Sequence, residues 1–126
     1  MKFLTHSISF AALAAAALLI PTTSLAADAE AGKATFNANC SSCHGESGKG
    51  DGPVGAALQP PPRDFTVGDF KFDADGDGTP GTDADLTAVI SQGAAAFGGS
   101  PLMAPWPTLS DEDVANVVVY IRTLKQ

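Results

Sequence analysis

The run Cys40-Ser41-Ser42-Cys43-His44 holds the residues of this chain best suited to do chemistry. A Cys-x-x-Cys-His run is the attachment signature of c-type haem. Each thiol can add across one vinyl group of the porphyrin, and the two-residue gap places both sulfurs on one side of a helical turn. The histidine after the second cysteine can then reach the iron. The run therefore predicts one haem, bound covalently through Cys40 and Cys43, with His44 as an iron ligand.

Other uses of paired cysteines need features that this chain offers only in part. A redox-active dithiol of thioredoxin type expects a βαβ context, whereas residues 30–39, before the motif, have a helical pattern. A zinc site needs about two more Cys or His ligands, and the only other histidine, His6, lies in the leader described next. A dithiol and a structural disulfide stay open as alternatives to haem.

Residues 1–26 have the features of a secretory signal peptide. Lys2 provides a positive start, residues 8–20 are apolar, and Ser24-Leu25-Ala26 offers small residues at both recognition positions of a cleavage site. The apolar stretch is about 13 residues, short of the roughly 20 that span a bilayer. We expect cleavage after Ala26, with Ala27 as the second choice. The mature domain, residues 27–126, should be soluble, without a membrane span, and periplasmic or otherwise exported.

The chain is acidic, with 7 Lys and Arg against 14 Asp and Glu. Loss of Lys2 with the leader leaves six basic side chains and a net charge of −8. Such a surface repels nucleic acid and anionic lipid, so we expect no nucleic-acid partner. It favours redox-partner proteins that dock through a basic patch. The alternative is that the acidity only keeps an exported protein soluble.

Helices are predicted before the motif, in the second half of the chain and at its end. Residues 28–39 should form a helix that leads into the motif. Thr82 and Asp85 resemble a capping box at the start of a second helix. Ser110 caps the last helix, in which apolar residues recur at helical spacing.

Two segments between these helices, residues 45–62 and 93–107, are rich in glycine and proline. That composition excludes a long helix or a central strand. Loops of this length are uncommon in a small domain unless they serve a function. We interpret the first of them, residues 45–62, as a segment that wraps a haem.

Over essentially all of the residues after the leader, the sequence resembles the class I cytochromes c, the monohaem electron carriers of bacteria. The residues that carry the resemblance are Gly32 and Phe36, the run from Cys40 to Gly45, Gly48-Lys49-Gly50-Asp51-Gly52-Pro53, Arg63-Asp64-Phe65, Met103 and Val119-Tyr120-Ile121. The resemblance implies an all-α cytochrome c fold, with three to four helices and long irregular loops around one haem. It also implies that Gly32 and Phe36 pack against Tyr120.

Met103 is the expected second axial ligand of the iron. After loss of the leader His44 is the only histidine and Met103 the only methionine, so one chain cannot form a bis-histidine site. The family's distal methionine also lies in a segment rich in glycine and proline, although Ala104 stands where proline is common. The alternative is that Met103 only fills a gap in the core and leaves the iron open.

Further contacts to the haem are implied less directly. A metal-bound histidine usually donates a hydrogen bond from its free ring nitrogen. The resemblance assigns the acceptor to the carbonyl of Pro53, with residues 60–62 or a water as alternatives. Arg63 and Trp106 are candidates for contact with the haem propionates, and ordinary packing is the alternative for both.

Residues 73–78 match the first half of a calcium-binding EF-hand loop, with Asp73, Asp75 and Asp77 at positions 1, 3 and 5 and glycine at 6. Position 12 is Ala84, where a glutamate is required, and no good helix precedes the loop. A looser calcium site at these three aspartates, with Asp83 added, is one hypothesis. A solvated acidic turn is the other.

The predicted function is electron transfer, in which iron cycles between Fe(III) and Fe(II) and no substrate is changed. We find no nucleophile–base pair and no paired carboxylates in a catalytic frame. One alternative is a haem-carrying electron-transfer subunit of a larger dehydrogenase or reductase complex. A thiol–disulfide oxidoreductase and a ligand-sensing five-coordinate haem protein are two others.

Overall fold

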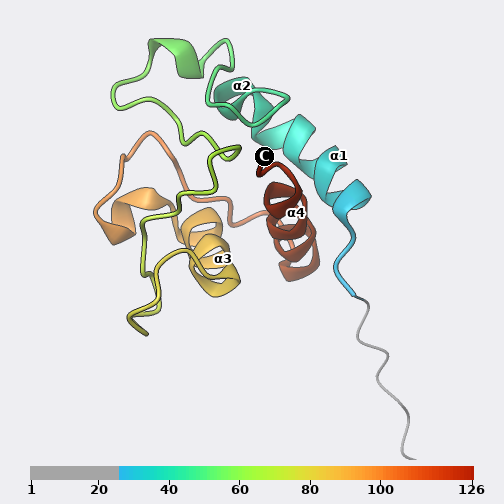
Figure 1. The fold of residues 1–126 in the computed structure, drawn as a ribbon, viewed down its shortest axis with the longest axis vertical. Coiled ribbons are helices and arrows are strands. Elements are labelled where there is room, and N and C mark those ends of the chain that lie inside the picture. Colours follow the sequence, from blue (N-terminus) through green and yellow to red (C-terminus); the bar gives the residue numbers. More distant parts are fainter. Residues whose placement is uncertain (1–25) are drawn as a thin grey trace, which may run out of the picture.

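The computed structural model describes residues 26–126, which form helices joined by long loops (Figure 1). The α-helices are α1 (Ala29–Asn39), α2 (Ser41–His44), α3 (Asp83–Gln92) and α4 (Asp111–Thr123). Two single 3-10 turns, η1 (Gly55–Ala57) and η2 (Ala94–Phe97), interrupt the loops. No strand occurs within residues 26–126, and the all-α prediction is confirmed. The predicted signal peptide, except for Ala26, lies outside the described residues.

None of the helices in the described part of the chain combines the length and the hydropathy of a membrane span.

Side chains that accept backbone hydrogen bonds determine where the three longer helices begin. Asp28 caps α1, with its carboxylate 2.8 Å from the amide nitrogen of Glu30. Thr82 with Asp85, and Ser110 with Asp113, form complete capping boxes at α3 and α4. These caps satisfy backbone donors that helix geometry leaves free. The starts of α3 and α4 agree with the sequence prediction.

Helix α4 lies between α1 and α3 and packs against both (Figure 1). At the crossing with α1, a Cβ on Gly32 would overlap the backbone carbonyl of Asn116 and lie 3.0 Å from the Cβ of Tyr120. Phe36 is fully buried one turn later, with its ring centroid 5.2 Å from that of Tyr120. The implied packing of Gly32 and Phe36 against Tyr120 is confirmed.

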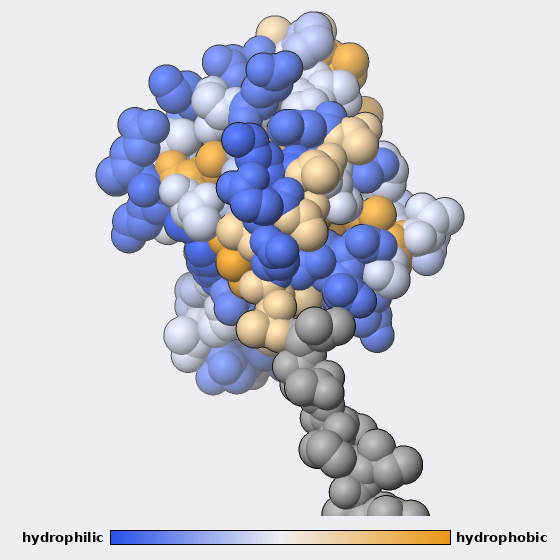
Figure 2. All heavy atoms as spheres, turned by 90° about the vertical axis from the view of Figure 1, so that its right-hand side faces the viewer, coloured by the Kyte–Doolittle hydropathy of each residue, from blue (hydrophilic) through white to orange (hydrophobic). Residues whose placement is uncertain are grey.

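The hydrophobic core joins the faces of α1, α3 and α4 that point toward one another. Its buried members are Phe36, Phe65, Leu86, Ile90, Val114, Val117, Val118, Tyr120 and Ile121. Figure 2 shows the molecule from the α1 side, where hydrophilic residues predominate and weakly hydrophobic ones run between them. The outer face of α1 exposes small alanines at 31, 34 and 38, so the apolar stripe that organises the fold points inward.

Candidate functional site

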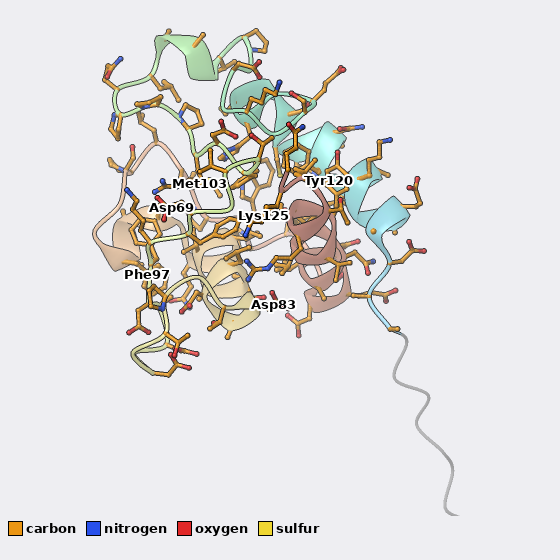
Figure 3. The ribbon with its side chains drawn as sticks, viewed as in Figure 1. Asp69, Asp83, Phe97, Met103, Tyr120 and Lys125 are labelled. Carbon is orange, nitrogen blue, oxygen red and sulfur yellow. The ribbon has the colours of Figure 1, made fainter. Side chains whose placement is uncertain are left out.

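A cavity of about 580 Å³ opens between α3, the loop before it and the segment after η2. That size lies within the range of about 300–1,000 Å³ that is usual for ligand sites. The lining is largely apolar and includes Cys43, His44, Phe65, Phe70, Leu86, Ile90 and Met103. Residues about sixty positions apart in the sequence, His44 and Met103, therefore face one space. In Figure 3 Met103 lies well away from Tyr120, which belongs to the crossing of α1 and α4.

His44 is held in a single orientation by its neighbours. Its ring stacks on Phe65, with centroids 4.5 Å apart and an angle of 18° between the planes. Its Nδ1 lies 3.1 Å from the carbonyl oxygen of Arg63 and donates to it in the Nδ1–H tautomer. Burial lowers the pKa of His44, although the bond to Arg63 partly opposes this. The neutral imidazole keeps Nε2 free, and this is the form that ligates metals.

The carbonyl that accepts from His44 belongs to Arg63, so the expectation of Pro53 is wrong. Gly52 and Val54, on either side of Pro53, donate to the carbonyls of Cys43 and Ser42 at 3.1 and 2.9 Å. These bonds hold the segment along α2, and Pro53 itself is exposed. Residues 60–62, the alternative acceptors, directly precede Arg63, whose carbonyl accepts the hydrogen bond from His44.

The two cysteines are half-buried and are not joined by a disulfide. Cys43 lines the cavity, whereas Cys40 packs against the hydrophobic core beside it. Burial, and secondly the nearby Cys43, raise the pKa of the Cys40 thiol to about 11. A thiol used in disulfide exchange has a lowered pKa, so this environment argues against the redox-active dithiol.

Backbone hydrogen bonds fasten the Met103 segment to the end of α3. The amide of Ala94 donates to the carbonyl of Met103 at 3.0 Å, and the amide of Trp106 donates to that of Ile90 at 3.0 Å. Gly93 permits this contact, because a Cβ there would lie 3.0 Å from the Met103 oxygen. Met103 is thus held on the cavity wall by its main chain.

Comparison with known proteins places the chain in a family. The family model described as cytochrome c matches residues 29–125. The chain is 36% identical over 103 residues to cytochrome c-554(547) of Halothiobacillus neapolitanus. The aligned region covers 79% of this chain and 100% of that protein. This chain belongs to the cytochrome c family. Its cofactor is therefore a covalently bound haem c, and its function is haem-based electron transfer.

Two other proteins that are similar to this chain are much longer. The cbb3-type cytochrome c oxidase subunit CcoP of Azospirillum brasilense is 31% identical over 100 residues, which are 79% of this chain and 29% of that protein. A chain of the Kuenenia stuttgartiensis reducing HAO-like protein complex superposes with a TM-score of 0.64 at 36% identity, over 78% of this chain and 43% of that one. The chain thus spans less than half of either relative.

The residues around the cavity of this cytochrome c fit a haem. Its lining is largely apolar and includes His44, Met103 and Cys43. Two cationic residues, Arg63 and Lys71, are also part of its lining and could pair with the two propionates. Lys71 was not expected from the sequence. Trp106 packs against the hydrophobic core, and its contact with a propionate stays a prediction.

Replacing Gly93 with alanine should destabilise this cytochrome c by about 2 kcal/mol, because its φ of +81° and ψ of 152° suit only glycine and the added methyl group would crowd Met103. Thermal unfolding followed by circular dichroism measures the loss. Gly98→Ala is the control at an open position: its φ of +80° and ψ of 11° lie in the left-handed region, which strains alanine less, and nothing lies within 4 Å of the added Cβ, so it should lose less stability. Equal losses in both variants would contradict a role for the close approach to Met103.

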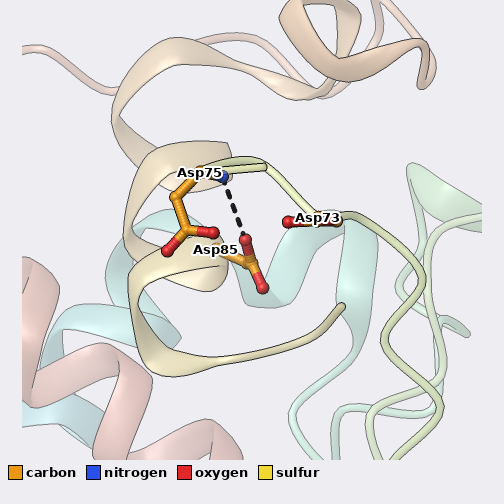
Figure 4. A group of neighbouring side chains, drawn as sticks. All are labelled: Asp73, Asp75 and Asp85. Atoms are coloured by element: carbon orange, nitrogen blue, oxygen red, sulfur yellow. Dashed lines mark hydrogen bonds between the residues drawn. The ribbon is translucent and has the colours of Figure 1, made fainter. Parts of the chain in front are cut away.

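The structure groups the acidic residues differently from the predicted calcium loop. Carboxylate oxygens of Asp73, Asp75 and Asp85 lie within 4.8 Å of one another (Figure 4), whereas Asp77 is not part of this group. Asp77 accepts a hydrogen bond from the amide of Thr79 in the same loop, and Asp73 accepts one from the amide of Gly78. Calcium binding at Asp73, Asp75 and Asp77 stays a prediction from the sequence.

Proposed function

We propose that this protein is an electron carrier whose haem is attached to Cys40 and Cys43 and ligated by His44 and Met103. The haem supplies a one-electron Fe(III)/Fe(II) couple when bound. The observation that carries the assignment is that His44 and Met103 line the same cavity, with Cys43 beside them. Met103 is the only methionine after Met1, so no other thioether is available for this role.

The protein's own groups suit a fast and reversible couple. The Arg63 carbonyl orients His44 and holds its ring proton on Nδ1, while burial keeps the ring neutral, so Nε2 stays free. The main-chain bonds of Met103 hold the second ligand without the help of its flexible side chain. The walls of the cavity are largely apolar, and a thioether ligand raises the reduction potential of a haem. Held by both His44 and Met103, the iron would have no ligand position left for a substrate.

A haem-carrying subunit of a larger complex is the second candidate. It is favoured by the similarity to longer proteins, one an oxidase subunit and one from an HAO-like complex.

The net charge of −8 after loss of Lys2 supports redox partners that dock through a basic patch. We also propose that residues 1–26 direct the chain to the periplasm. Co-purification of a stoichiometric larger subunit from the native host would favour the second candidate.

Cys40→Ala/Cys43→Ala should abolish covalent haem attachment when the protein is secreted by a host competent in haem attachment. Intact-mass spectrometry should show residues 27–126 plus one haem for the wild type and bare polypeptide for the double variant. Visible spectra, oxidised and reduced, should show the haem bands in the wild type. Ser42→Ala, which alters the motif but keeps both thiols, should retain the haem. A wild type with the mass of polypeptide alone would refute the proposal.

A further inference from the structure

Asp85 is a buried carboxylate that the proposed electron transfer does not use. It lies in the first turn of α3, is 1% exposed and contributes to the lining of the cavity. One oxygen accepts from the amides of Ala74 and Asp75 at 2.6 and 3.3 Å. The other accepts from the amide and hydroxyl of Thr82 at 2.8 and 2.9 Å. Four donors fill the accepting capacity of an ionised carboxylate.

The capping box of α4, formed by Ser110 and Asp113, shows how Asp85 differs from an ordinary capping residue. Asp113 makes the same two contacts at the start of α4, to the amide and hydroxyl of Ser110 at 3.2 and 2.7 Å. It accepts nothing from a distant loop, is more exposed and lies outside the cavity lining. Asp85 therefore does more than cap a helix: it ties α3 to the segment that follows the cavity-lining residues 70–72.

The charge of Asp85 is not neutralised by a basic partner. Burial alone would raise the pKa of this carboxyl, yet the hydrogen bonds from Thr82, Ala74 and Asp75 together lower it, so the group stays ionised. Neither of the two ion pairs among residues 26–126 includes it. Its acidic neighbours, Asp73 and Asp75, carry charge of the same sign.

We infer that Asp85 is a positioning residue of the haem cavity whose fixed negative charge also lowers the reduction potential of the bound haem. A negative charge in the wall of a poorly solvated cavity favours the more positive, oxidised state of a redox group that faces it. The four hydrogen bonds hold the charge and the loop in place in both redox states. The inference rests on the proposed haem electron transfer and adds to it how the chain sets the potential.

The test compares Asp85→Asn with Asp113→Asn in the intact holoprotein by spectroelectrochemical titration. Both variants remove one charge from the same kind of cap. Asp85→Asn should raise the potential, so that the ratio of oxidised to reduced protein at a fixed potential falls about threefold or more; a tenfold change would be 59 mV. Asp113→Asn should leave it almost unchanged, because this charge lies outside the cavity lining and, being more exposed than that of Asp85, is better screened by salt. Equal shifts in the two variants would overturn the inference.

Thr82→Val separates the charge from the loss of a hydrogen bond, since it removes the hydroxyl donor and keeps the carboxylate. It should leave the potential near that of the wild type, and a shift as large as that of Asp85→Asn would overturn the charge effect. If Asp85→Asn fails to fold, the smaller neutral variant Asp85→Ser replaces it, with the same expected rise and the same contradicting result.

Amide hydrogen exchange of the wild type tests the positioning role without any variant. The amides of Ala74 and Asp75 should exchange slowly, because a buried carboxylate accepts from both. Exchange as fast as that of the exposed Gly76 would overturn the role of Asp85. A chain that carries no haem would refute the proposed function itself. A haem protein with equal potentials in the two Asn variants would refute only the inference about Asp85.

Discussion

Replacing Gly32 with alanine should destabilise the holoprotein by about 3 kcal/mol, the upper end of the usual cost of overpacking. The added methyl group would overlap the backbone carbonyl of Asn116 and press on the Cβ of Tyr120. A backbone atom cannot rotate away as a side chain can, so α1 and α4 would have to separate. That movement would also pull Phe36 from Tyr120, whose rings are now 5.2 Å apart between centroids.

Urea or thermal unfolding of the holoprotein measures this effect. Lys33→Ala, at the exposed neighbouring position of α1, is the control and should change stability by less than about 0.5 kcal/mol. Alanine exceeds glycine in helix propensity by about 1 kcal/mol, so helix formation alone predicts the opposite sign. A Gly32→Ala protein as stable as the wild type, or more stable, would show that the helices tolerate greater separation.

Met103→Ala should lower the reduction potential by an amount on the order of 0.2 V, because axial ligands alone move haem potentials over about 0.8 V. Loss of the thioether leaves the iron with a harder ligand such as water, which stabilises the oxidised state. The weak far-red absorption band of methionine-ligated ferric haem should disappear at the same time. The haem should stay attached, since the two cysteines are unchanged. Redox titration and the oxidised visible spectrum measure both effects.

Leu102→Ala is the control for this experiment. Leu102 directly precedes the proposed ligand, is 55% exposed and also lines the cavity, so its truncation alters the same wall but keeps the thioether. The far-red band should persist in this variant. If Met103→Ala retained the band and the potential of the wild type, Met103 would not be the iron ligand, and its role would be that of a core residue.

Much of the fold follows from neighbours in the sequence. The capping boxes at Thr82 and Ser110 depend on residues three positions apart, and the apolar stripe of α4 on helical spacing. The haem-attachment prediction depends on five consecutive residues, Cys40 to His44. Such features need no knowledge of how distant segments meet. They agree with the helices observed and with membership of the cytochrome c family.

Contacts between loops were decided by the tertiary structure alone. The carbonyl that accepts from His44 belongs to Arg63 and not to Pro53, because the segment around Pro53 is hydrogen-bonded to the backbone of α2. Asp85 joins Asp73 and Asp75 in place of Asp77, because α3 folds back onto the acidic loop.

The physical reason for the division is the range of the interactions. The types and spacing of residues close in the chain determined the haem motif, the helix starts and the buried face of α4, since local geometry is regular there. Loops rich in glycine and proline have no period from which their path can be read. Which carbonyl meets His44 and which carboxylate is buried beside the cavity depend on how those loops pack against the helices, and only the folded chain specifies that.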